Sequence, residues 1–212
     1  MDLFRAKTDV KKGANEQVVL PLSVPRQSVA RVTEVRSTSV VASIELLREE
    51  GQFERYASAL LDHRDEILSC IAGEWLPVAV ARAHYEACDA LGLSASEQFA
   101  MGRAAAQHAR TGWVAQALRI VRAVGVTPWS LVGFLDRMWA RGMKGGAVAV
   151  YRLGPKEARL EFIGCELFQI PYYRNAYRGV IDALGAAFSE RHYTQELPRC
   201  SANEGIFKTQ WV

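Results

Sequence analysis

The chain has 212 residues, of which 50% are hydrophobic and 23% charged, and its formal net charge is +3. This length and composition fit a single globular domain and exclude a disordered protein. The net charge is too small to indicate nucleic acid unless the basic residues cluster. The first residues lack the apolar stretch of a signal peptide, and no apolar run approaches the roughly 18 residues of a membrane span. We therefore expect a cytoplasmic protein.

The N-terminal part differs in character from the rest of the chain. Residues 1–28 are mostly polar and carry several basic residues, with one apolar run at 18–20 that is followed by a proline. This pattern predicts a basic, partly ordered arm with one short strand, and a solvated tail is the alternative. Residues 29–212 contain no repeat and no low-complexity segment, so we expect them to form a single α+β domain.

Apolar residues at three- and four-residue spacing predict a series of helices in the first two thirds of the chain. Ser94 and Glu97 form a capping box, and Thr127 precedes Pro128 at the first position of a helix, where Val126 can pack on Leu131. Asp62 is the expected N-cap of a short helix that ends at a glycine. The expected helices cover residues 40–50, 53–61, 62–73, 77–91, 94–110, a segment through 118 and 121 that ends near 125, and 128–139.

The stretch 143–188 predicts a β-hairpin followed by an amphipathic helix. Residues 147–153 are apolar on both alternating faces, and residues 158–163 alternate between apolar and charged side chains. A Gly-Pro-Lys turn joins them, and Pro171 starts a helix whose apolar stripe runs to about residue 188. Residues 193–197 and 205–212 predict a second hairpin. The expected fold is an N-terminal helical bundle followed by hairpin–helix–hairpin in a small antiparallel sheet.

Four stretches of the chain are similar to a family of uncharacterised myxobacterial paralogues of about this size. They are VVASIELLREEG, EWLPVAVARAHYEACDALGL, GGAVAVYRLGPKEARLEF and IPYYRNAYRG. More remotely, residues 75–212 resemble a superfamily in the order of their elements. Its branches are the haem-NO-binding domains, the vinyl-reductase-type ligand-binding domains and the small subunits of the TRAPP vesicle-tethering complex.

The resemblance implies a fold of this superfamily without haem. In haem-NO-binding domains, a helix of the form NLDxLH supplies the histidine that ligates the iron. The similar segment here, GFLDRMW, places Trp139 at that position, and an indole nitrogen only donates hydrogen bonds. The Tyr-x-Ser-x-Arg motif that holds the haem propionates corresponds to YRLGP, which retains Tyr151, followed by Arg152, and lacks the serine and the last arginine.

The sequence indicates no catalytic or metal site. His84 and Cys88 lie four residues apart on an expected helix and make half of a metal site at most; a histidine at the edge of the core near a buried thiol is the alternative. Cys165 follows a glycine in a loop, but no base is indicated for it. No CxxC pair, GxSxG, P-loop or Rossmann motif occurs. We expect reduced thiols, no metal, no cofactor and no enzymatic activity.

One cluster combines aromatic and basic side chains: Tyr172, Tyr173, Arg174, Tyr177 and Arg178. It predicts either a recognition surface, including an anion contact at the helix start, or tyrosines in the core with arginines that are solvated or paired with Glu166 or Asp182. We expect most of the tryptophans in the core and one or two beside a cavity or a dimer seam. They are Trp75, Trp113, Trp129, Trp139 and Trp211.

Three functional hypotheses follow. The first is a non-enzymatic protein-interaction or assembly module, expected to be a homodimer. The second is a sensor that binds a small apolar ligand between the helices and the sheet. The third is a nucleic-acid-associated regulator, suggested by the basic arm and the two arginines of the cluster. The candidate ligand- or partner-binding residues are Trp139, Tyr151, Arg152, Tyr172, Tyr173, Arg174, Tyr177 and Arg178.

Overall fold

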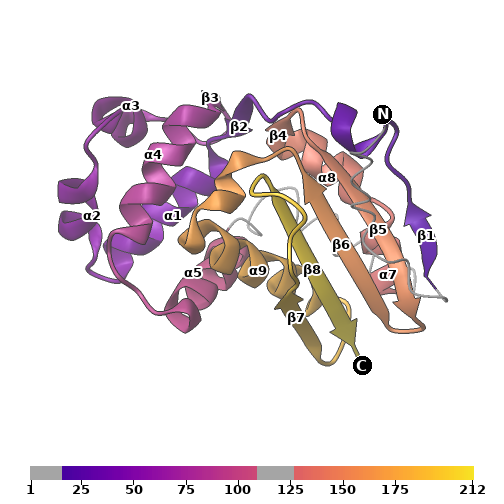
Figure 1. Ribbon diagram of the computed structural model, residues 1–212. Coiled ribbons are helices and arrows are strands. Elements are labelled where there is room, and N and C mark those ends of the chain that lie inside the picture. The colour runs from indigo at the N-terminus through magenta and orange to yellow at the C-terminus, as the bar shows by residue number, and fades with distance from the viewer. Residues whose placement is uncertain (1–15, 109–126) are drawn as a thin grey trace.

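The computed structural model describes residues 16–108 and 127–212. Helices α1 to α5 gather at one end of the molecule and a twisted sheet forms the other, with α9 between them (Figure 1). The fold is therefore α+β, as the sequence predicts. The expected helix through 118 and 121, the Val126 contact, Trp113 and most of the basic arm lie outside the described residues. None of the described helices has the length and apolarity needed to cross a membrane.

A five-stranded sheet holds both predicted hairpins. Its strand order is β1-β5-β6-β8-β7, and every neighbouring pair is antiparallel. The predicted short strand near the N-terminus is β1, which pairs with β5. The strands are β1 (Gln17–Leu20), β5 (Ala147–Gly154), β6 (Glu157–Ile163), β7 (His192–Glu196) and β8 (Glu204–Trp211).

The two faces of β6 have different partners. Leu160 and Phe162 face the helices and are nearly inaccessible. Arg159 and Glu161 alternate with them, so they lie on the outer face, yet both are buried as well. The N-terminal segment covers them with an outer ionic cluster, in which Arg26 contacts Glu161 and its Nη1 lies 2.9 Å from Glu204 Oε2. Arg159 joins this cluster, with Nη1 2.5 Å from Glu16 Oε1 and Nε 2.9 Å from Glu161 Oε1.

A second, three-stranded sheet was not predicted. Its order is β3-β2-β4, formed by β2 (Glu34–Arg36), β3 (Trp75–Pro77) and β4 (Met143–Lys144). These strands have two or three residues each, which is too short for an alternating pattern to be recognised. Because β2 precedes α1, β3 precedes α4 and β4 follows α8, the sheet brings one end of each of these three helices together.

The helices α1 (Thr38–Glu49), α2 (Phe53–Ala59), α3 (Arg64–Ser69), α4 (Val78–Asp89) and α5 (Ala95–His108) follow the predicted order. The capping box of α5 is confirmed, since Ser94 N donates to Glu97 Oε2 at 2.7 Å and Glu97 N donates to Ser94 Oγ at 3.3 Å. The predicted cap of α3 is wrong. His63 precedes that helix with a left-handed φ of 55°, so the chain turns one residue later than Asp62. Ile71 lies beyond α3 and is exposed.

The single helix expected over 128–139 is two helices, α7 (Pro128–Val132) and α8 (Leu135–Gly142). Gly133 ends α7, and Phe134 leaves helical geometry with φ −108° and ψ 4°. Helix α9 (Pro171–Gly185) begins at the predicted proline and ends three residues before the expected position. Two 3-10 turns, η1 (Arg26–Ser28) and η3 (Glu166–Gln169), complete the described elements.

Candidate ligand-binding cavity

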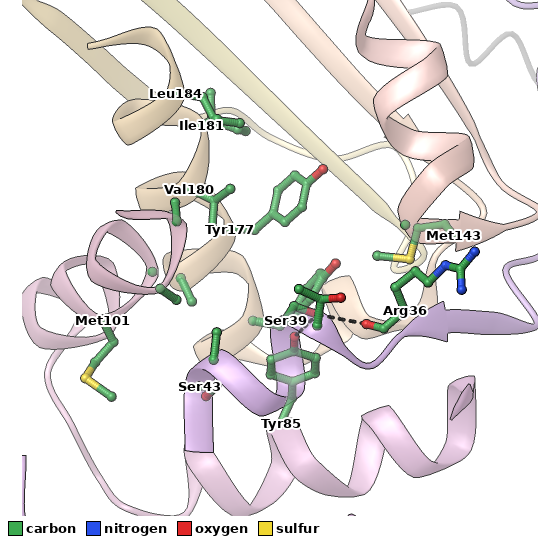
Figure 2. Close-up of a pocket in the computed structure, with 18 of the residues that line it drawn as sticks. Arg36, Ser39, Ser43, Tyr85, Met101, Met143, Tyr177, Val180, Ile181 and Leu184 are labelled. Carbon is green, nitrogen blue, oxygen red and sulfur yellow. Dashed lines mark hydrogen bonds between the residues drawn. The ribbon is translucent and has the colours of Figure 1, made fainter. Parts of the chain in front are cut away.

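A cavity of about 320 Å³ lies between the helical part and the sheet. It is bordered by α1, α4, α5, α8, α9 and the inner face of β6, and Figure 2 shows how side chains from these elements surround it. The described residues that line it are Arg36, Thr38, Ser39, Ala42, Ser43, Leu46, Tyr85, Met101, Gly102, Ala105, Ala106, Leu135, Met138, Trp139, Gly142, Met143, Phe162, Tyr172, Tyr173, Ala176, Tyr177, Val180, Ile181 and Leu184.

Most of the cavity wall is apolar because two helices turn their apolar stripes toward it. On α9, Val180, Ile181 and Leu184 follow one another at helical spacing and lie along one side of the cavity (Figure 2). On α5, the small residues Ala105 and Ala106 line the same region. An apolar wall of this kind suits the apolar body of a ligand.

One end of the cavity carries hydroxyl groups. The Tyr85 hydroxyl donates to Ser39 Oγ at 3.3 Å, and Ser39 Oγ donates to the backbone oxygen of Arg36, also at 3.3 Å (Figure 2). Tyr85 is buried, whereas Ser39 is exposed, so this end of the cavity meets solvent. Burial raises the pKa of Tyr85 above its ordinary value, so its hydroxyl stays protonated at neutral pH.

Arg36 is the charged side chain among the described lining residues, and it is already engaged. Its guanidinium stacks 4.0 Å from the Trp75 ring centroid and donates to the backbone oxygens of Gly73 and Arg141. In Figure 2 the guanidinium extends away from Tyr177 and Val180. The Arg36 guanidinium is therefore not placed to pair with a charged ligand group in the interior of the cavity.

Four of the predicted site residues line the cavity: Trp139, Tyr172, Tyr173 and Tyr177. Trp139 Nε1 donates to the backbone oxygen of Gly145 at 2.9 Å, and its ring packs on Phe162 with 5.4 Å between centroids. Tyr177 extends from α9 toward Met143 across the space between them (Figure 2). Burial raises the pKa of both Tyr172 and Tyr177, which keeps these phenols neutral.

The other four predicted residues lie elsewhere. Tyr151 is opposite Arg159 in the β5–β6 register and 4.4 Å from its guanidinium, so it is on the outer face of the sheet. Arg152 stacks at 4.2 Å on Trp129. The contacts of the two helical arginines differ from the pairing with Glu166 or Asp182 that was one of the alternatives. Arg174 Nε lies 3.1 Å from Glu196 Oε1 and its Nη1 donates to backbone oxygens, while Arg178 stacks at 4.8 Å on Phe99.

Sequence reasoning missed the hydroxyl end of the cavity and its α5 wall. Ser39 lies at the start of α1, where a hydroxyl residue is ordinarily interpreted as a helix-start signal. Gly102 and the neighbouring alanines of α5 give no chemical signal of their own. Small residues at three- and four-residue spacing on one helix face do indicate close packing or a space beside it, and Gly102, Ala105 and Ala106 have that spacing.

Three titratable residues outside the cavity that the sequence analysis considered are buried: His84, Cys88 and Cys165. His84 and Cys88 share a helix face, with Cys88 Sγ 3.7 Å from His84 Nε2, and Tyr56 Oη lies 2.6 Å from His84 Nδ1. Burial raises the pKa of Cys88 and of Cys165 to about 12, so both thiols are poor nucleophiles at neutral pH. All four cysteines are unpaired. Within 16–108 and 127–212, no group of three metal-binding side chains occurs.

Comparison with solved structures finds haem-NO-binding (H-NOX) domains. An Fe(II) unliganded H-NOX variant from K. algicida matches with a TM-score of 0.62 at 6% identity, over 84% of this chain and 96% of that chain. An H-NOX variant from T. tengcongensis gives 0.56 at 11% identity, over 83% and 97% of the two chains. An oxygen-binding H-NOX domain related to soluble guanylate cyclases gives 0.55 at 12%, over 83% and 94%. No family model and no curated protein matches. The chain therefore has the H-NOX fold.

Proposed function

We propose that this protein is a non-enzymatic ligand-binding domain of the H-NOX fold that holds a small apolar molecule in the cavity beside Trp139. The observation that carries the proposal is the cavity of about 320 Å³ with its largely apolar wall. This volume falls at the small end of the roughly 300–1,000 Å³ typical of ligand pockets. The sensor hypothesis expects a ligand between the helices and the sheet, and the cavity lies there. For this reason we prefer the sensor hypothesis to the interaction module.

Haem does not fit the side chains of this cavity. Of the described lining residues, none is histidine or cysteine. Trp139 occupies the position of the iron-ligating histidine in the sequence resemblance, and its N–H donates to Gly145. A phenolate ligand is disfavoured because burial raises the pKa of Tyr177. The propionates would also need cations, and Arg36 is stacked on Trp75. We therefore propose an organic ligand in place of haem.

A fluorescent apolar probe tests the cavity. 1-Naphthylamine, whose size suits a cavity of this volume, should bind the purified protein saturably, with one site per chain. Ala105 lines the cavity and is half-buried, so Ala105→Phe should place a ring in it and abolish binding. The matched control is Ala100→Phe on the exposed side of the same helix, which should bind as the parent does. Absence of saturable binding by the parent, or equal binding by Ala105→Phe, would overturn the proposal.

Haem is tested in the same preparation by titrating hemin and recording the Soret band. We expect no stoichiometric complex in the parent protein. A one-to-one complex with a sharp, shifted Soret band, lost in Ala105→Phe and kept in Ala100→Phe, would show that haem is the ligand. Haem would then be the ligand in place of an organic molecule, and the cavity would still be the binding site.

A further inference from the structure

The direction of the hydrogen bonds at the hydroxyl end restricts the ligand. Tyr85 gives its hydrogen to Ser39, and Ser39 gives its hydrogen to the backbone oxygen of Arg36. Both hydroxyl hydrogens are thus used within the protein. Each hydroxyl oxygen has two acceptor lone pairs, so the Ser39–Tyr85 pair offers a ligand acceptor capacity. A ligand group that donates a hydrogen bond is complementary to it.

Charge leads to the same choice. The described lining residues include no carboxylate, lysine or histidine, and the guanidinium of Arg36 is held by Trp75 and two backbone oxygens. A buried carboxylate needs a cation or donors that stabilise its charge. An ionised carboxylate also has no hydrogen to donate. The head of the ligand is therefore uncharged.

Cavity size sets the length of the ligand. The volume of about 320 Å³ is roughly twice that of the about 150 Å³ engineered cavity that takes up benzene, so it suits a ligand of roughly ten non-hydrogen atoms. Val180, Ile181 and Leu184 follow α9 away from Ser39 and Tyr85 (Figure 2). The space is thus polar at one end and apolar along its length.

From these three observations we propose that the ligand is an uncharged single-chain amphiphile of medium length. Its head donates a hydrogen bond to the Ser39–Tyr85 hydroxyl pair, and its alkyl chain lies along α9. This inference rests on the proposed function, because it assigns a chemical class to the ligand of the same cavity. A medium-chain alcohol is the simplest member of the class.

Displacement of 1-naphthylamine by three probes of similar length tests the class. 1-Nonanol has a donor, 2-nonanone only accepts, and nonanoate accepts and is charged. We expect 1-nonanol to bind roughly tenfold more tightly than 2-nonanone, the effect of one hydrogen bond of about 1.4 kcal/mol, and nonanoate to bind most weakly. In Ser39→Ala the Tyr85 hydroxyl loses its acceptor and can donate its hydrogen to the ketone, so the preference for the alcohol should disappear. Ser39 is exposed, so this variant should fold normally. Ser69→Ala, a serine outside the cavity, is the control.

The outcomes separate the two proposals. If the fluorescent probe binds but the ketone competes as well as the alcohol, the cavity is a binding site and the donor head is wrong; the Tyr177 hydroxyl would then be the group to replace. If nonanoate binds most tightly, the uncharged head is wrong. If the preference for the alcohol persists in Ser39→Ala, the placement of the head is wrong. If the fluorescent probe itself fails to bind the parent, the proposed function fails and the ligand class with it.

Discussion

Gly102 of α5 lies directly against the backbone of Ala176 on α9. A methyl group at Gly102 would come within 1.9 Å of the Ala176 backbone oxygen, a distance that requires the helices to separate. Gly179 of α9 makes the reciprocal contact, since a methyl group there would lie 2.1 Å from the Phe99 backbone oxygen. The two helices that wall the cavity are thus held at a separation that only glycine permits at these positions.

Gly102→Ala should destabilise the protein strongly. The new methyl group meets backbone, which cannot move aside as a flexible side chain can, so we expect the free energy of unfolding to fall by about 2 kcal/mol or more. Urea unfolding followed by circular dichroism measures this loss. Gly133→Ala is the control, because its nearest neighbours would be 3.6 Å away. Its stability should change by less than about 1 kcal/mol. Equal effects of the two substitutions would contradict the close packing of α5 on α9.

His84 should make stability decline as the pH falls. Burial lowers its pKa to about 3, whereas an unfolded histidine titrates near 6.5. Between these values the unfolded chain binds a proton that the folded protein excludes, so protonation favours unfolding. From pH 7 to pH 5 the parent should lose about 2 kcal/mol more than His84→Gln does. In His63→Gln, which alters an exposed histidine, the parental decline should persist. If His84→Gln declines as steeply as the parent, His84 is not the group responsible.

Arg26 should matter more than an exposed arginine. It lies between Glu161 and Glu204, whose side chains are only 2% and 5% exposed. Removing it leaves the buried Glu204 carboxylate without this cation and Glu161 with Arg159. Because the Arg26 guanidinium itself is 30% exposed, Arg26→Ala should cost about 2 kcal/mol. Arg82 pairs with Glu86 on the surface of α4, and Arg82→Ala should cost less than about 0.5 kcal/mol. Chemical unfolding of both variants compares them, and similar losses would refute the role of the outer ionic cluster.

Ser94→Ala should weaken the start of α5 through the loss of its cap. The Ser94 hydroxyl accepts from the Glu97 backbone N–H, and a helix N-terminus that loses such a cap is destabilised by about 1 kcal/mol. Thermal unfolding should show a correspondingly lower midpoint. Ser58→Ala removes a hydroxyl that bonds within α2 to the Glu54 backbone oxygen, and it should leave the midpoint almost unchanged. A larger effect at Ser58 than at Ser94 would count against the capping box.

Features with a local cause could be predicted from the sequence. The Gly154-Pro155 turn, the alternation around Leu160 and the proline at the start of α9 each act within a few residues, and the structure has the corresponding hairpin and helix. The three-stranded sheet and the α5–α9 contact depend on residues far apart in the chain. For the candidate site, Tyr151 shows that a position in the sequence does not by itself predict which face of the sheet a side chain occupies. Its sequence position matches a haem motif, but the pleat of β5 turns it to the outer face.

The position of β1 has a consequence for the edge of the five-stranded sheet. β1 pairs with β5, whose sequence AVAVYRLG is among the most apolar of the strands. If proteolysis or truncation removed β1, the backbone groups on that side of β5 would become an open sheet edge, which is a template for strand addition from another copy. The ion pairs of Glu16 and Arg26 anchor the segment on either side of β1 to the sheet. We therefore expect shortened forms that lack β1 to aggregate more readily than forms that begin before residue 16.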